Sequence, residues 1–261
     1  MEILFEGRVI SLLLTVFLFV ALLLLIERAK KGTFPQIRRL PPLDAIDEAI
    51  RRAVEMGKPV HFTTGYGGGG LNTASGKYHL VGLTVYNKVS SLTAELDVRL
   101  IGSFCHPELV PIAEDIINKN YLMAGKPEAV KPEMAQLIGG QQFAYAMGVM
   151  GILLEERPAA NIMIGNWWAE SLLVAETGTI VNAMQIAGGT DVTAVPMLVA
   201  ACDYVLMFEE LFAAKAYLTE EPALIGSLAS QDLFKYLALV FGLIGVVFAT
   251  LGIDWSWFLN L

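Results

Sequence analysis

Residues 59–76 read PVHFTTGYGGGGLNTASG. The first six of them, Pro59–Thr64, form a short apolar run of strand-forming residues, and a glycine cluster at 65–70 follows directly. Asn72, Thr73 and Ser75 then offer N-cap side chains for a helix that extends to about Leu96. The stretch therefore predicts a strand, a glycine-rich turn and a helix, which together make one βα unit of a sheet.

The same arrangement recurs further along the chain. Each of three further predicted strands ends in an unusual turn, CHPE, GNWWAE or AGGTD. Alternating strands and helices require crossover connections, so we expect an α/β fold, a Rossmann-like three-layer domain with a mainly parallel sheet. The strands are predicted at Asp97–Phe104, Asn161–Gly165 and Ala183–Ala187; the helices at Glu108 to about Met123, about Glu133–Glu155, about Trp168–Glu176, and from the Gly188–Asp191 turn to about Leu218.

Two uncharged runs of 18 residues flank this region, at Val9–Ile26 and Tyr236–Ile253. Each approaches the roughly 20 residues that cross a bilayer. A cleaved signal peptide is the alternative for the first run. A retained span is favoured because the run exceeds the usual h-region of about 7–15 residues and ends in Glu27-Arg28-Ala29-Lys30-Lys31. We therefore predict N- and C-terminal transmembrane helices around the α/β domain.

Two other apolar stretches, Gly139–Leu154 and Ala194–Phe208, are shorter and carry Gly, Pro or Asp. They read as buried helices of the α/β domain, and a broken or re-entrant membrane helix stays an alternative.

The positive charges predict an orientation. Seven Lys and Arg residues lie in the segment 27–57 directly after the first run, only Arg8 precedes that run, and none follows the second run. The positive-inside rule then places both short termini outside the cell membrane and the main domain in the cytoplasm, with Trp255 and Trp257 at headgroup level. The predicted parts are an external N-terminus (1–8), a span (9–26), a basic juxtamembrane segment with an amphipathic helix from Pro41 to its Gly57 C-cap (27–57), a cytoplasmic α/β domain (58–235), a second span (236–253) and an external C-terminus (254–261).

Composition excludes several classes of protein. A soluble domain has about 45–50% apolar and about 25% charged residues, whereas this chain of 261 residues has 55% hydrophobic and 17% charged residues. Its net charge of −8 disfavours nucleic acid as a partner. Cys105 and Cys202 make no disulfide framework and no CxxC motif.

Ligands of open parallel sheets bind at the carboxyl ends of the strands, where glycine-rich turns and helix N-termini meet. The four turns therefore form one candidate site for a small anionic ligand. A tight structural turn explains the glycines equally well, and N-capping explains Asp191. No catalytic residue, metal ligand or cofactor is assigned. The candidate ligand-binding residues are Gly67, Gly68, Gly69, Gly70, Asn72, Thr73, His106, Asn166, Glu170, Gly188, Gly189, Thr190 and Asp191.

Other chemistry-bearing residues favour structural roles. Cys105-His106 is a Cys–His pair in which His61 on the neighbouring strand could act as a base, but a buried Cys is the simpler interpretation. His79 lies on an apolar helix face and reads as a satisfied core residue. Glu176 and Thr177-Gly178-Thr179 are further candidates for lining the strand-end rim.

Several stretches together resemble one known family. They are FTTGYGG (62–68), DVRLI (97–101), QQFAYAMGVMGILLEERPAANIMIG (141–165), AESLLVAETG (169–178), MQIAGGT (184–190), VAACDYVLMFEEL (199–211) and AYLTEEPALIGSLASQD (216–232). The chain closely resembles an uncharacterised prokaryotic membrane-protein family described as a domain of unknown function. The resemblance covers most of residues 40–235 and implies no activity, cofactor or site residue.

The functional expectation rests on the residues alone. Small-residue helices, flanking spans and the absence of a complete catalytic constellation favour a membrane-anchored protein that forms a homo-oligomer. One alternative is an enzyme or sensor that binds a nucleotide or acyl ligand at the strand ends. A second is a channel or transporter component, which requires residues 139–154 or 194–208 in the bilayer.

Overall fold

The computed structural model describes residues 9–32 and 39–252. The chain divides into two compact units. The α/β unit comprises residues 39–218, and the hairpin unit comprises the described residues on either side of it. The α/β unit thus begins and ends earlier in the chain than the predicted 58–235.

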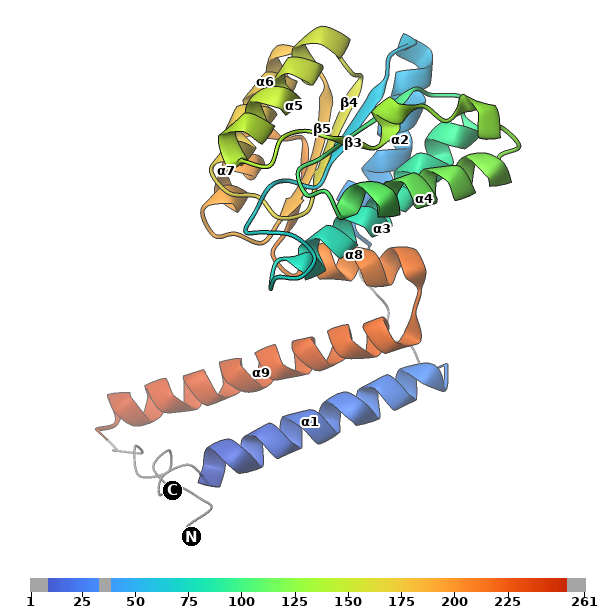
Figure 1. Ribbon diagram of the computed structural model, residues 1–261. Coiled ribbons are helices and arrows are strands. Elements are labelled where there is room, and N and C mark those ends of the chain that lie inside the picture. Colours follow the sequence, from blue (N-terminus) through green and yellow to red (C-terminus); the bar gives the residue numbers. More distant parts are fainter. Residues whose placement is uncertain (1–8, 33–38, 253–261) are drawn as a thin grey trace. The chain divides into compact units, whose positions relative to one another are not determined.

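A six-stranded parallel sheet forms the centre of the α/β unit, with the strand order β3-β2-β1-β4-β5-β6 (Figure 1). This is the order of the doubly wound Rossmann fold, in which the chain reverses direction across the sheet between β1 and β4. The α/β prediction and the four predicted strands are confirmed. The strands are β1 Val60–Thr63, β2 Leu100–Phe104, β3 Gln136–Leu137, β4 Ala160–Ile164, β5 Met184–Gly189 and β6 Tyr204–Met207.

The two edge strands lie where the sequence predicted helix. β3 has two residues and follows the 3₁₀ turns Pro127–Ala129 and Pro132–Met134, so the helix predicted from Glu133 begins only at Gln142. β6 interrupts the long helix predicted to reach Leu218. Periodicity does not separate a short apolar strand from a buried helix, which is why both predictions were wrong.

Helices cover both faces of the sheet (Figure 1). One core cluster joins the sheet to α2 Pro41–Met56, α3 Gly76–Glu95, α4 Leu109–Met123 and α8 Glu210–Thr219. A second cluster joins the opposite face to α5 Gln142–Glu156, α6 Glu170–Ile180 and α7 Ala194–Ala201. Gly57 adopts the left-handed conformation after α2, as a C-cap glycine should. The segments 139–154 and 194–208 therefore belong to the α/β unit.

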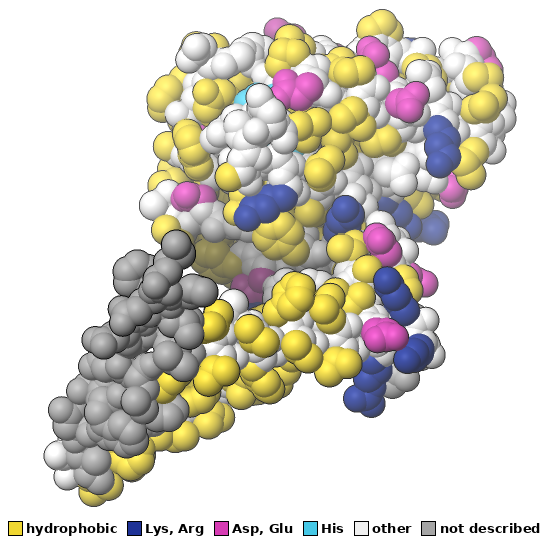
Figure 2. Space-filling model, turned by 60° about the horizontal axis from the view of Figure 1, so that its bottom comes forward, with side chains coloured by type: hydrophobic (Ala, Val, Ile, Leu, Met, Phe, Trp, Pro, Cys, Tyr) yellow, Lys and Arg dark blue, Asp and Glu magenta, His cyan; other side chains and the backbone are white. Residues whose placement is uncertain are grey.

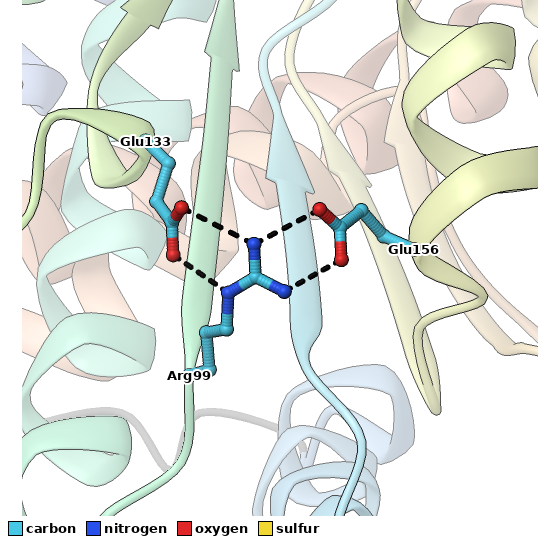
Figure 3. A network of polar contacts seen from close by, with 3 residues as sticks. All are labelled: Arg99, Glu133 and Glu156. Atoms are coloured by element: carbon cyan, nitrogen blue, oxygen red, sulfur yellow. Dashed lines mark hydrogen bonds and ion pairs between the residues drawn. The ribbon is translucent and has the colours of Figure 1, made fainter.

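An ion-pair clip fastens one end of the sheet (Figure 3). The guanidinium of Arg99, directly before β2, makes two bonds of 2.6 and 3.1 Å to Glu133 and two of 2.5 and 2.9 Å to Glu156 at the end of α5. Bidentate pairs fix geometry more firmly than single contacts. The clip therefore links the segment before β3, which carries Glu133, to α5, which carries Glu156.

The hairpin unit consists of α1 Val9–Lys30 and α9 Pro222–Thr250, which pack side by side (Figure 1). Gly226 near the start of α9 faces Ile26 near the end of α1, so the helices are antiparallel. Both are long and apolar enough to cross a membrane, with mean hydropathies of 2.8 and 2.1. α9 begins 14 residues before the predicted span at Tyr236. Arg8, Trp255 and Trp257 lie outside the described residues.

Candidate functional site

The predicted site lies at the carboxyl ends of β1 and β4, where the strand order reverses. The loop after β1 runs through residues 64–75, and the loop after β4 through residues 165–169. In folds of this type the crevice between these two loops receives the ligand. Its geometry decides what the edge can bind.

Asn166 holds the two loops together. Its backbone N–H donates to the carbonyl of Thr64 (3.1 Å), and its carbonyl accepts the N–H of Gly67 (3.0 Å). Its side-chain amide donates to the Gly67 carbonyl (2.7 Å) and to the Ser75 hydroxyl (3.2 Å). Because Asn166 is buried, these bonds give the β1–β4 edge a fixed arrangement made by the chain itself.

The glycine cluster lets other parts of the chain approach its backbone closely. A Cβ atom at Gly65 would overlap the Asn166 carbonyl, and Gly65 also has a φ of +75°. A Cβ atom at Gly67 would lie 2.5 Å from Asn166 Cγ, and one at Gly70 would overlap the carboxylate of Glu108. The crevice is thus filled by Asn166 and the buried Trp167 ring.

Carboxylates of the chain occupy the backbone donors along this edge. The N–H of Leu71 donates to Glu108 (3.1 Å), and the N–H of Trp168 donates to Glu170 (3.1 Å). Asp191 accepts the N–H groups of Thr193 (2.8 Å) and Ala194 (3.0 Å), and Glu210 accepts the N–H of Met207 (3.1 Å). An external anion would compete with these internal ones for the same donors.

The edge is also acidic. Residues 64–76, 105–108, 165–170, 188–193 and 207–210 contain no Lys or Arg. Hydrogen bonds from the backbone N–H of Glu108 itself and then of Leu71 hold the pKa of the Glu108 carboxyl below its usual range. The Thr193 hydroxyl and then backbone donors lower the pKa of Asp191 in the same way. Both groups are therefore ionised at neutral pH.

Two imidazoles hydrogen-bond to backbone carbonyls of the glycine loop. The Nε2 of His79 donates to the Gly69 carbonyl, and the Nε2 of His106 donates to the Tyr66 carbonyl, both at 3.0 Å. The rings lie 4.9 Å apart. Burial, followed by the neighbouring His106, lowers the pKa of His79 to about 4, so its buried Nδ1 is a bare acceptor without a side-chain or backbone partner. The sequence predicted a core histidine with its hydrogen bonds satisfied, and this holds for only one of the two ring nitrogens.

The Tyr66 ring stacks on His106 at 5.8 Å between centroids and meets the edge of Trp168 at 6.2 Å. Trp168 is exposed, whereas the adjacent Trp167 is fully buried. The loop after β1 is therefore held by aromatic packing as well as by hydrogen bonds.

Cys105 is not arranged as a nucleophile. Its thiol donates to the Gly65 carbonyl (2.9 Å), and burial raises its pKa well above the usual range. His61, the candidate base, hydrogen-bonds instead to Asn161 (2.8 Å) and Ser103 (2.9 Å). Cys105 is thus buried, as the sequence favoured, and it does not pair with His61 because both groups are engaged elsewhere.

The structure brings only some of the predicted residues into one assembly. Gly67, Gly68, Gly69, Gly70, His106 and Asn166 lie in the bonded loops described above. Thr73 bonds locally to Gly70, Asn72 is exposed, and Glu170 is buried beside Gln142. Gly188 and Gly189 were expected in a turn but are buried within β5, and Thr190 and Asp191 follow it.

Thr177 and Thr179 lie in the last turns of α6, which begins at the rim with Glu170, so the prediction that they line it was wrong. Sequence reasoning assigned no role to Tyr66 or Glu108, and it predicted His79 as a core residue and Trp168 as part of a pocket wall or an interface. The signal for Glu108 was its place in the turn that follows β2.

Two pockets of about 300 Å³ lie elsewhere. One is lined by residues that include Glu114 and Lys131, and the other by residues that include Arg52 and Asp203. The second pocket is also lined by Thr179, one of the further candidates from the sequence, and neither pocket is lined by one of the candidate ligand-binding residues. Within residues 9–32 and 39–252, no group of three or more His, Cys, Asp or Glu side chains is placed to hold a metal ion.

Fold and site together define a doubly wound α/β protein whose β1–β4 edge is hydrogen-bonded to the chain's own groups, with two helices that could span a membrane. The chain belongs to the family described as Domain of unknown function (DUF6754), whose model matches residues 1–259. Neither the curated proteins nor the solved structures gave a significant match.

Proposed function

We propose that this chain is a membrane-anchored α/β protein that assembles with copies of itself, with the α/β unit in the cytoplasm. The observation that carries the proposal is an apolar outer surface on the layer formed by α5, α6 and α7. A homo-oligomer is favoured over catalysis because the edge where a ligand would bind is bonded to its own carboxylates.

The assembly face is made of large apolar side chains on three adjacent helices. α6 packs against both α5 and α7, so their outer sides form one surface. Met147 on α5 and Ile180 on α6 are each 69% exposed. A soluble monomer seldom leaves such a cluster in water. The assembly face comprises Phe143, Met147, Leu154, Leu172, Leu173, Ile180 and Val199.

The opposite layer shows what an ordinary water-facing helix of this protein looks like. α2 carries six charged residues among 16, and its buried residues lie on one side. α7, by contrast, has no charged residue among eight. This difference between α2 and α7 supports burial of the α5–α7 layer against another copy, in which Glu176 is the charged residue on the exposed side of α6.

The antiparallel hairpin supports the proposed topology. The chain leaves α1 at Lys30 and enters α9 at Pro222, and antiparallel packing puts these two points at the same end of the hairpin. The α/β unit is therefore attached on one side of the membrane. Arg28, Lys30 and Lys31 at this end favour the cytoplasmic side, with both termini outside.

Binding of a small anionic ligand at the β1–β4 edge is a second candidate, favoured by the strand order alone. Such a ligand would have to displace Glu108 from Leu71, and the enzyme or sensor alternative depends on the same displacement.

The mass of the full-length chain in detergent, measured by light scattering over a concentration series, tests the assembly. We expect an oligomer, and we expect Met147→Glu to shift it toward the monomer because a charge cannot be buried in an apolar contact. Leu122→Glu is the matched control, since it places the same charge on an exposed apolar position of α4. A parent chain that is monomeric at every concentration, or an unchanged mass for Met147→Glu, would contradict the proposal.

A further inference from the structure

The uncharged runs of α1 and α9 are offset from each other along the helix axes. Gly226 faces Ile26, with a Cβ atom at Gly226 only 2.6 Å from the Ile26 Cα. Ile26 is the last residue of the uncharged run of α1, whereas Gly226 lies ten residues before the uncharged run of α9. The polar first part of α9 therefore runs alongside the apolar stretch of α1.

The helical rise shows how deep this polar part reaches. Asp232 lies six residues beyond Gly226, or about 9 Å along the axis, and Lys235 lies about 13 Å along it. The uncharged run of α1 is about 27 Å long at the same rise. Lys235 is thus level with the middle of that run, and Asp232 is level with its inner third.

These two charged side chains point away from α1. Gly226 and Ser230, spaced four residues apart, are buried, and such a pair of small residues lets two helices approach closely. Asp232 and Lys235 form an ion pair of 3.6 Å within one chain, and their side chains remain 66% and 54% exposed and thus accessible to a second copy. Figure 2 shows hydrophobic side chains along the hairpin and charged ones gathered at one end.

We propose that Asp232 and Lys235 form a charged contact between the α9 helices of two copies within the membrane. The inference rests on the proposed function, which supplies the membrane and the self-association. Charged groups at hydrocarbon depth are stable when they face protein groups of opposite charge. Copies inserted in one orientation have parallel α9 helices, so Asp232 of each copy can face Lys235 of the other around a two-fold axis.

Disulfide crosslinking in native membranes tests this contact. Tyr236→Cys introduces a thiol beside Lys235 at a position that is 71% exposed, in a full-length Cys202→Ser chain. We expect a crosslinked dimer, and at least a fivefold lower yield when Asp232→Lys or Lys235→Asp is added, because like charges then meet. Co-expression of these two variants under different tags should return the mixed dimer to within twofold of the parent yield.

The control is the exchanged chain, Asp232→Lys with Lys235→Asp, which keeps both charges and should crosslink like the parent. Resistance to carbonate extraction confirms that each variant is inserted. Where a charge-reversed chain is not inserted, Asp232→Asn and Lys235→Gln replace it, with the same fivefold loss expected.

Undiminished crosslinking of the like-charge or neutral variants, or no rescue in the mixed dimer, overturns the inference. An oligomer that is sensitive to Met147→Glu but does not crosslink at Tyr236→Cys removes this contact and leaves the proposed function standing. A monomeric parent chain removes both.

Discussion

His61 is the centre of a polar ladder that crosses the sheet interior. Its Nδ1–H donates to Asn161, whose amide donates to Gln185 (3.1 Å), and Ser103 bonds the other ring nitrogen. His61, Asn161 and Gln185 are in register on β1, β4 and β5. Because every member has a partner, the ladder fixes strand register without leaving a buried polar group unsatisfied.

The ladder predicts a loss of stability in mild acid. Burial lowers the pKa of His61 to about 4, against about 6.5 in the unfolded chain. Below pH 6.5 the unfolded state binds the proton first, so the free energy of unfolding falls as the pH drops from 6.5 toward 4. We expect a loss on the order of 1–2 kcal/mol at pH 5 from this residue.

Thermal unfolding of the full chain in detergent at pH 7 and pH 5 measures this loss. His61→Gln, whose amide can both donate and accept, should reduce the difference between the two pH values. His79 has a similarly lowered pKa and accounts for part of the remainder. An identical pH dependence in His61→Gln and the parent would show that His61 does not carry the effect.

Glu108 gives a second prediction at the residue scale. Its carboxylate occupies the Leu71 N–H, so inorganic phosphate should not stabilise the parent chain. Glu108→Ala frees this donor and removes a negative charge. We expect phosphate at ten times its Kd to stabilise the variant by about 1.4 kcal/mol. Glu114→Ala on the outer side of α4 is the control for loss of charge, and equal phosphate responses in all three chains would argue against an anion site here.

At the scale of elements, the sequence predicted strands best where each is followed by its own turn. β1, β2, β4 and β5 were found because glycine or polar clusters mark their ends. β6 was missed because its YVLM sequence sits in a continuous apolar stretch between two helices. What makes it a strand is the open edge of β5, together with Asp203, whose carboxylate accepts the Gln185 N–H (2.7 Å).

The candidate site, too, was predictable from the sequence only in part. The glycine cluster and Asn166 were identifiable from the sequence, because they follow predicted strands. Their bonding to each other was not, since it depends on which strands are neighbours. Gly188 and Gly189 were misplaced because β5 extends two residues further, beside Leu206 and Met207 of the missed strand β6.

Two helix glycines test how far tertiary packing overrides helix propensity. Replacing glycine by alanine inside a helix usually stabilises by about 0.5–1 kcal/mol. Gly151 in α5 has open space where the methyl group of an alanine would lie, so Gly151→Ala should follow this rule. A Cβ atom at Gly178 in α6 would overlap Gln185 Oε1 and lie 3.1 Å from the Asn161 amide nitrogen.

We therefore expect Gly178→Ala to destabilise the protein by about 1–3 kcal/mol, through displacement of the polar ladder. Thermal unfolding of the two variants side by side gives the comparison. Shifts of the same sign would mean that the ladder tolerates the methyl group.

At the scale of the whole molecule, the proposed topology predicts where labels can reach. Asp115 lies on the exposed side of α4, outside the assembly face, and makes a suitable reporter when replaced by cysteine. Cys202 is a poor reporter, because burial raises its pKa to about 12. In a Cys202→Ser chain, Asp115→Cys should react with an impermeant maleimide in inside-out vesicles. Labelling in intact cells instead would reverse the proposed orientation.

The sequence by itself determined the α/β class, four strands, both long apolar helices and the turns at the strand ends. These features depend on local periodicity, charge and turn chemistry, which a single chain displays directly. Tertiary structure alone decided the strand order, the two edge strands and the offset between α1 and α9. It also decided that the glycines receive Asn166 and that Glu108 occupies a backbone donor, because both contacts join residues that are distant in sequence.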